Sequence, residues 1–255
     1  MLKLMKYEFR KNRTGLAVML GIAAGLFALA PLGRATDREE LMLISVFLLF
    51  TYAFAAYVYA LVRGITAYSG ELRGRTGYLL LMVPRSSMSI LFGKLLFTLF
   101  FALAMLAVSA LALFASGAIL LEEMYEVKGA LELTRFMMAQ SGIDPAVFGS
   151  YALYVAVRIL TSVLTIVAMG YLAVTLSATV LQGGKLRGLV SLLFFAALAV
   201  LTGYLQNRVS PAVADLYAAY GTVMRAALPV ILLDAALTCA YTALSAVLLQ
   251  KKVSL

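Results

Sequence analysis

Six long runs of apolar residues, separated by short polar segments, dominate this chain. Several of them reach the roughly 20 residues that a helix needs to cross the hydrocarbon core of a bilayer. The composition agrees: 64% of the 255 residues are hydrophobic and 13% are charged, whereas about a quarter of an average soluble protein is charged. The sequence therefore predicts an all-α, polytopic membrane protein, with one transmembrane domain over residues 1–255.

The boundaries of the six predicted spans follow from these runs. The spans cover residues 15–32, 41–62, 95–121, 145–181, 189–205 and 226–249. Before the first span, Leu2, Met5 and Phe9 form an apolar helical stripe opposite a stripe of basic residues. This pattern is typical of a helix lying in the headgroup plane, so we predict an interfacial helix within residues 1–13. A plain basic flank of the first span is the alternative.

The distribution of charge predicts the orientation. Of the 21 Lys and Arg residues, fourteen fall on the side that carries both termini and six on the other, while the acidic residues divide two to nine. Basic residues accumulate in cytoplasmic loops. We therefore expect a multi-pass protein of the plasma membrane, bacterial in origin, with both termini in the cytoplasm and residues 122–146 as an extracytoplasmic segment. The net charge of +9 then reflects orientation in the lipid bilayer, and no nucleic-acid partner is expected.

The polar segment between the second and third spans, residues 63–94, contains an ordered pattern of residues. In chain order it reads Glu71, Arg73, Thr76, Leu79, Leu80, Pro84, Arg85, Gly93 and Lys94. Residues 71–81 predict a helix of about three turns. This helix should end before Pro84, because a proline disfavours the α conformation of the residue preceding it.

This pattern resembles the cytoplasmic loop of type-2 ABC exporter (ABC-2 type) permeases. In that family the loop after the second span carries a short coupling helix, which docks onto a separate ATPase subunit. The resemblance implies that the nine residues above contact an ABC ATPase, and that a second permease subunit, in a homo- or heterodimer, completes the transporter. It also implies that this chain binds no cofactor, since ATP and Mg²⁺ bind the ATPase. One departure is that a basic residue follows Pro84 directly, whereas the family carries it further on.

The sequence lacks the residues that several kinds of catalytic, metal and nucleotide-binding site require. The chain has no histidine, which excludes histidine-based catalytic triads and HExxH zinc sites. It also lacks a GxxxxGK[ST] loop for nucleotide phosphates. We therefore expect a transport subunit without enzymatic activity of its own. The alternative is a stand-alone six-helix carrier, or a membrane scaffold, without ATP coupling.

Two charged residues, Arg158 and Asp234, lie far from any predicted loop. If their helices enter the bilayer near Ser150 and Leu228, both residues lie roughly 9–12 Å deep on parallel helices. Because an unpaired charge at a span centre costs about 2.5–3.5 kcal/mol, we predict an intramembrane charge pair. In the alternative, Arg158 extends to the headgroups and Asp234 bonds a hydroxyl such as that of Thr238.

Two tyrosines of the second span are candidates for lining a substrate path. Tyr52 and Tyr59 are seven residues apart and so share one helix face. Ordinary aromatic packing between helices is the alternative.

The predicted orientation can be tested by cysteine accessibility in a variant without Cys239. Cysteines introduced at Gly184 and Leu255 should react only after the membrane is permeabilised, whereas one at Ser141 should react in intact cells. Labelling of Gly184→Cys from outside intact cells would contradict the layout.

Overall fold

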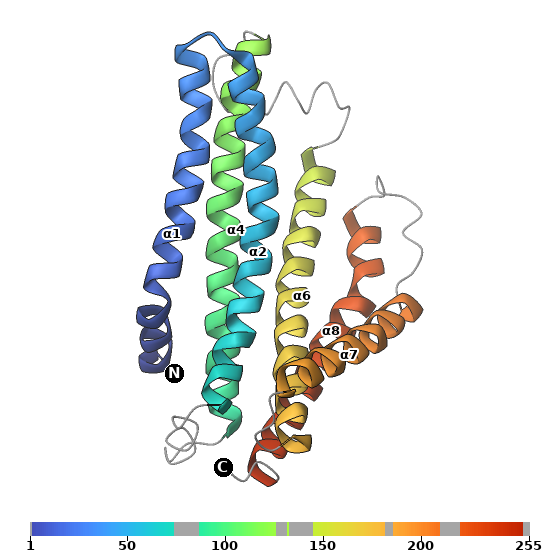
Figure 1. Cartoon of the computed structure of the whole chain (residues 1–255). Helices are drawn as coiled ribbons and strands as arrows, with labels where there is room; N and C mark the ends of the chain where they lie inside the picture. The colour runs from blue at the N-terminus through green and yellow to red at the C-terminus, as the bar shows by residue number, and fades with distance from the viewer. Residues whose placement is uncertain are drawn as a thin grey trace. The chain divides into compact units, whose positions relative to one another are not determined.

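The computed structural model contains six α-helices in the part of the chain that it describes (Figure 1). The helices are α1 (Leu2–Ala35), α2 (Glu39–Arg73), α4 (Ser87–Tyr125), α6 (Pro145–Val180), α7 (Arg187–Val209) and α8 (Tyr220–Lys251). The structure describes residues 2–73, 87–125, 132, 145–181, 186–209 and 220–251. Side chains are described for these residues apart from 2–5, 73, 145–148, 150, 220–226 and 251.

All six helices are long and apolar enough to cross a membrane, and the described residues contain no strand. The predicted all-α fold with six possible spans is therefore confirmed. Most helices are longer than a span requires: α4, with 39 residues, is about 58 Å long, roughly twice the ~30 Å thickness of a bilayer core. The ends of such helices must tilt within the bilayer or project from it.

The helices extend into segments that the sequence analysis treated as separate. Helix α1 is continuous from Leu2 through the first span, so residues 2–13 are helical; their place in the headgroup plane stays a prediction. Helix α2 continues to Arg73 and α4 begins at Ser87. Most of the predicted coupling helix, and most of the extracytoplasmic segment 122–146, therefore lie outside the described residues.

The chain divides into two compact units. The larger unit comprises residues 1–6, 61–99 and 149–255, and the smaller unit comprises residues 7–60 and 100–148. Helices α2 and α4 contribute to both, because each passes from one unit into the other along its length.

In the smaller unit, polar contacts between otherwise apolar helix faces join α1, α2 and α4. The Tyr52 hydroxyl donates to the carbonyl of Met19 at 2.8 Å, and Ser45 donates to the carbonyl of Leu26 at 2.9 Å. At the far end of α1, Arg34 lies 3.3 Å from a carboxylate oxygen of Glu122. These contacts join α1 to α2 and to the end of α4.

A tight turn between α1 and α2 ends the first helix. The amide of Arg38 donates to the carbonyl of Gly33 at 2.9 Å, and Asp37 has a φ of 49°. This is the arrangement of a Schellman motif, which needs a left-handed residue just past the helix. Aspartate tolerates that conformation better than most residues.

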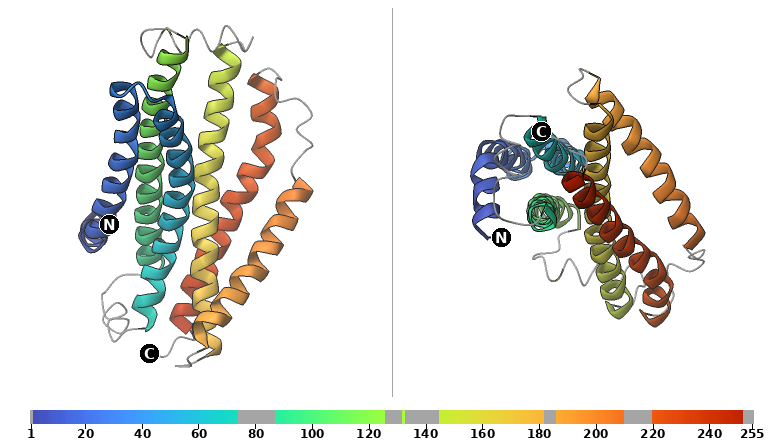
Figure 2. Two further views of the ribbon diagram at one scale, coloured as in Figure 1. Left: turned by 45° about the horizontal axis from the view of Figure 1, so that its top comes forward. Right: turned by 90° about the horizontal axis from the view of Figure 1, so that it is seen from below.

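The larger unit consists of the end of α2, the start of α4, and helices α6, α7 and α8. Figure 2 shows α6 and α8 running in the same direction along the chain, with α7 crossing beside them at an angle. Tyr68, Leu91 and Tyr171 are among its fully buried side chains. Only Thr202 of α7 is buried. The core of this unit therefore lies between α2, α4, α6 and α8, with α7 at its surface.

Close packing of α2 against α4 depends on Gly64. A Cβ atom added there would lie 3.0 Å from Cβ and 2.5 Å from Oγ1 of Thr98. Thr98 is buried and its hydroxyl donates to the carbonyl of Lys94, so this branched side chain has little freedom to move aside. Only glycine allows α2 to approach α4 so closely at this position.

Substitution of Gly64 by alanine should destabilise the protein by about 1–3 kcal/mol, the usual cost of overpacking. Gly203→Ala is the matched control, because a Cβ atom at Gly203 meets nothing within 4 Å. Thermal unfolding in detergent, followed by size-exclusion chromatography, compares the two variants. Equal melting temperatures for both would contradict the proposed close approach.

Candidate functional site

An ion pair joins the two ends of the basic segment between α2 and α4. Glu71 lies in the last turn of α2 and Lys94 in the second turn of α4. The Lys94 Nζ and Glu71 Oε2 atoms are 2.7 Å apart, and only 4% and 12% of the two side chains is exposed. Both residues belong to the pattern identified in the sequence, where they were not recognised as partners.

Aromatic and hydroxyl groups join the end of α2, which carries Glu71, to α6. The Tyr68 hydroxyl, one turn before Glu71, lies 2.8 Å from Oγ1 of Thr175. Because Thr175 donates its own proton to the carbonyl of Tyr171, the tyrosine is the donor. The rings of Tyr68 and Tyr171 pack with centroids 4.6 Å apart. Helix α6 is thus fixed against the end of α2 close to the ion pair.

The buried ion pair specifies the alignment of α2 and α4. Removing charges from water is costly, and their attraction often does no more than offset that cost. Breaking such a pair is strongly destabilising, however, because it leaves one buried charge without compensation. Helices α2 and α4 are therefore held in the arrangement that brings Glu71 to Lys94. As a consequence, the end of α2 and the start of α4 are held near each other.

The remaining residues of the pattern are only partly visible. Gly93 is buried in α4 beside Lys94. Arg73 is the last residue of α2, and its side chain is not described. The other members lie outside the described residues: Thr76, Leu79, Leu80, Pro84 and Arg85.

A second polar cluster lies between α6, α7 and α8. Arg158 Nη1 donates to Oδ2 of Asp234 at 2.6 Å, and Gln206 Nε2 donates to Oδ1 of the same carboxylate at 2.6 Å. The Asp234 side chain is fully buried, whereas 28% of the Arg158 side chain is exposed. The two charges that the sequence placed at similar depth are thus in direct contact, and each carboxylate oxygen has a donor.

Two threonines, Thr165 on α6 and Thr238 on α8, extend this cluster. The hydroxyls of Thr165 and Thr238 both donate to the backbone carbonyl of Asp234, at 3.2 and 2.8 Å. The alternative considered from the sequence placed the hydroxyl of Thr238 on the carboxylate of Asp234. Here that hydroxyl reaches the backbone, and the carboxylate is left to Arg158 and Gln206.

Gln206 is the member of the cluster that the sequence analysis missed. The predicted fifth span ended at residue 205, so Gln206 was assigned to a loop. Helix α7 continues to Val209, which places Gln206 inside a helix and opposite Asp234. A polar amide directly after a long apolar run was the available signal, since buried polar groups require partners.

The two candidate path tyrosines, both in the smaller unit, pack between helices. Tyr52 is 7% exposed and bonds the backbone of Met19 on α1. The ring of Tyr59 packs on Phe101 with centroids 6.5 Å apart, and its hydroxyl lies against Gly15. These contacts account for both aromatic side chains as helix packing; a role in lining a path stays a prediction.

Neither polar cluster contains a group of side chains that could hold a metal ion. Within the residues whose placement is described, no three His, Cys, Asp or Glu side chains gather where they could hold a metal ion. Comparisons with protein-family models, with curated proteins and with solved structures give no match. The function must therefore be argued from the chain itself.

Replacing Asp234 with alanine should destabilise the protein by about 3–5 kcal/mol, because Arg158 would lose its buried counter-charge. Exchanging the two residues, Arg158→Asp with Asp234→Arg, should recover part of that loss. Thermal unfolding of the single and double variants in detergent measures both effects. If the two single effects simply add, the residues are not energetically coupled.

Proposed function

We propose that this chain is the membrane-spanning permease subunit of an ATP-binding-cassette exporter, driven by a separate ATPase subunit. Six helices long enough to span a membrane and the ordered polar segment between α2 and α4 support this proposal. The observation that carries it is the Glu71–Lys94 ion pair. It links the first and last parts of the pattern that resembles an ATPase-coupling loop.

A coupling segment must pass force from a partner into the spans. The ion pair holds together the end of α2 and the start of α4, the two helices that flank residues 74–86, and Tyr68 continues the connection into α6 through Thr175. Displacement of the segment by an ATPase would therefore move the ends of α2 and α4 together. A loop attached to two unlinked helices would instead absorb the motion by bending.

The proposed assembly contains two permease subunits and the ATPase. Six spans would be half of a twelve-helix transporter whose path is shared between two copies or two related chains. In this arrangement ATP and Mg²⁺ bind the ATPase, and the permease contributes the path and the contact with the motor. Cytoplasmic termini in the plasma membrane follow from the positive-inside distribution of charge.

A second candidate function is a stand-alone carrier or scaffold without ATP coupling. The Arg158–Asp234 pair favours a carrier, because ionisable residues within spans mark substrate and ion pathways. The two candidates differ in their partner. Purification of the tagged chain from native membranes should recover an ABC ATPase if the first is correct, and recovery of no ATPase would favour the second.

The coupling proposal predicts two kinds of defect. Deletion of Leu79 and Leu80 should abolish co-purification of the ATPase and the ATP hydrolysis that accompanies it, while the protein remains inserted and abundant. Glu71→Lys should uncouple ATP hydrolysis from transport, because it places two ammonium groups where an ion pair stood.

The exchange variant, Glu71→Lys with Lys94→Glu, distinguishes loss of the pair from loss of a particular residue. It should recover most of the activity lost in Glu71→Lys, since the opposite charges again face each other. Glu122→Lys, at the other end of α4, is the matched charge-reversal control. This variant should still co-purify with the ATPase and keep its ATP hydrolysis coupled to transport. The proposal would be contradicted if the variant without Leu79 and Leu80, at wild-type abundance, still co-purified with a normal amount of ATPase and showed normal ATP hydrolysis.

A further inference from the structure

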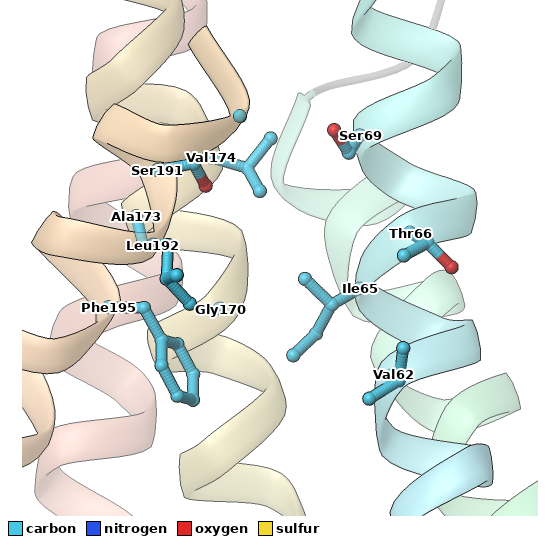
Figure 3. Close-up of a pocket in the computed structure, with 11 residues that line it drawn as sticks. Val62, Ile65, Thr66, Ser69, Gly170, Ala173, Val174, Ser191, Leu192 and Phe195 are labelled. Atoms are coloured by element: carbon cyan, nitrogen blue, oxygen red, sulfur yellow. The ribbon is translucent and has the colours of Figure 1, made fainter. Parts of the chain in front are cut away.

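A cavity of about 290 Å³ lies within the larger unit, between α2, α6 and α7 (Figure 3). The described residues that line it are apolar apart from three hydroxyl side chains, and none of them is charged. Such a cavity between candidate spans suits hydrocarbon, but it offers nothing that would select one ligand. Exposed basic residues are found in the other unit, at the start of α1.

The start of α1 differs in direction from the rest of the helix. In the right view of Figure 2 most of α1 is seen end-on, whereas its first turns, drawn in the darkest blue, run across that direction. Helix α1 is one of the candidate membrane spans. When the later part of the helix crosses a bilayer, its first turns therefore lie along the membrane surface.

Three consecutive residues in these turns have three different surroundings. Glu8 is 2% exposed, and Asn12, one turn further on, is 4% exposed and donates to the carbonyl of Glu8 at 3.0 Å. This side of the helix is buried against the protein. Phe9 is 55% exposed, and Arg10 is exposed as well. Because successive residues of a helix are about 100° apart, Glu8, Phe9 and Arg10 mark three separate faces.

The face of Phe9 is apolar. In the sequence, Met5 and Leu2 precede Phe9 by four and seven residues, the spacing of residues on one side of a helix. Tyr7 is also largely exposed, at 65%, but it lies about 160° away from Phe9 around the helix. Phe9 is therefore on the side suited to insert among lipid acyl chains, and Tyr7 is on the opposite side.

The face of Arg10 is basic. Lys6 lies four residues before Arg10 and Arg13 three residues after it, so the three share one side of the helix, and all three are exposed. This side is about 100° from Phe9 and about 160° from the buried Glu8. When Phe9 is directed into the hydrocarbon, the basic residues therefore point away from the protein, within the headgroup layer.

We propose that the start of α1 binds the headgroups of anionic phospholipids, with Phe9 inserted beneath them and Lys6, Arg10 and Arg13 beside their negative charge. The charge distribution of the chain assigns this end of α1 to the cytoplasmic side, where anionic lipids are enriched. Glu8 is the one acidic residue among the first 36, and it is buried, so the exposed surface matches the lipid in charge. This interaction does not depend on coupling to an ATPase.

The orientation of the segment can be tested with single cysteines in a Cys239→Ala background, using the full chain in nanodiscs of phosphatidylcholine and phosphatidylglycerol. Tyr7→Cys should react readily with a water-soluble maleimide, whereas Phe9→Cys should react several-fold more slowly. Cysteine is itself a small hydrophobe, so Phe9→Cys keeps its face apolar. Both variants should react equally after unfolding in sodium dodecyl sulfate. Equal rates in the nanodisc would overturn the proposal.

The preference for anionic lipid can be measured in the wild-type chain by photo-crosslinking in phosphatidylcholine nanodiscs. Two trace probes, a phosphatidylglycerol and a phosphatidylcholine, carry the same photoactivatable group and differ only in the headgroup. Mass spectrometry should find residues 6–14 labelled about fivefold more by the phosphatidylglycerol probe. High salt should reduce this difference, because it screens exposed charges.

A pair of double variants shows whether the basic face causes that preference. Arg10→Gln with Arg13→Gln should bring the labelling of residues 6–14 by the two probes to within about twofold of each other. Arg38→Gln with Arg208→Gln removes the same charge from exposed residues elsewhere and should leave the preference unchanged. Equal labelling by the two probes in the wild-type chain would overturn the proposal, as would a preference that the first double variant keeps in full. The wild-type comparison is decisive even if a variant fails to fold.

Discussion

The need to pair charge in surroundings of low polarity governs how this chain is assembled. Glu71 and Lys94 occupy the ends of two apolar helices, and Arg158 and Asp234 lie within two others. An isolated ion is costly to bury, so each charge restricts the helix that carries it to arrangements in which its partner is within reach. The Glu71–Lys94 pair joins two helices that follow one another, and the Arg158–Asp234 pair joins two that are distant along the chain. Apolar contact alone would align the helices of either pair only loosely.

Helix α6 connects both clusters in the larger unit, and it is the most deeply buried of the six candidate spans. Arg158 and Thr165 on its first half contact α8, and Tyr171 and Thr175 on its second half contact α2 and its neighbours. A rotation of α6 about its axis would disturb both sets of contacts at once. The helix therefore provides a physical link between the end of α2 and the Arg158–Asp234 pair.

The long apolar helices could be predicted well from the sequence, because the thickness of a bilayer sets the length of the apolar run that crosses it. The predicted fourth span, 145–181, differs by one residue from α6. Helix ends were less predictable: α2 and α4 continue past their apolar runs, since polar residues such as Glu71 and Lys94 remain helical when they pair. The similar depth of Arg158 and Asp234 along two parallel helices was enough to predict that they form a pair. The contact of Gln206 with Asp234 and that of Glu71 with Lys94 could not be predicted in this way. Both depend on the rotation and crossing of the helices, which no periodicity in the sequence specifies.

Helix α7 has an uneven attachment that affects its motion. Its side-chain hydrogen bonds to α8 come from Thr202 and Gln206, both near its C-terminal end, and Thr202 is its one buried residue. Few apolar contacts need to be lost for the first half of the helix to swing outward about that end, so its opening free energy is low compared with that of α6. Backbone amides near Ser191 should therefore exchange with solvent deuterium through local opening, well before those of the neighbouring helices. Helix α7 is thus held to α8 near Thr202 and Gln206, and local opening of its first half would also break the bond from Arg187 to the carbonyl of Leu72 on α2.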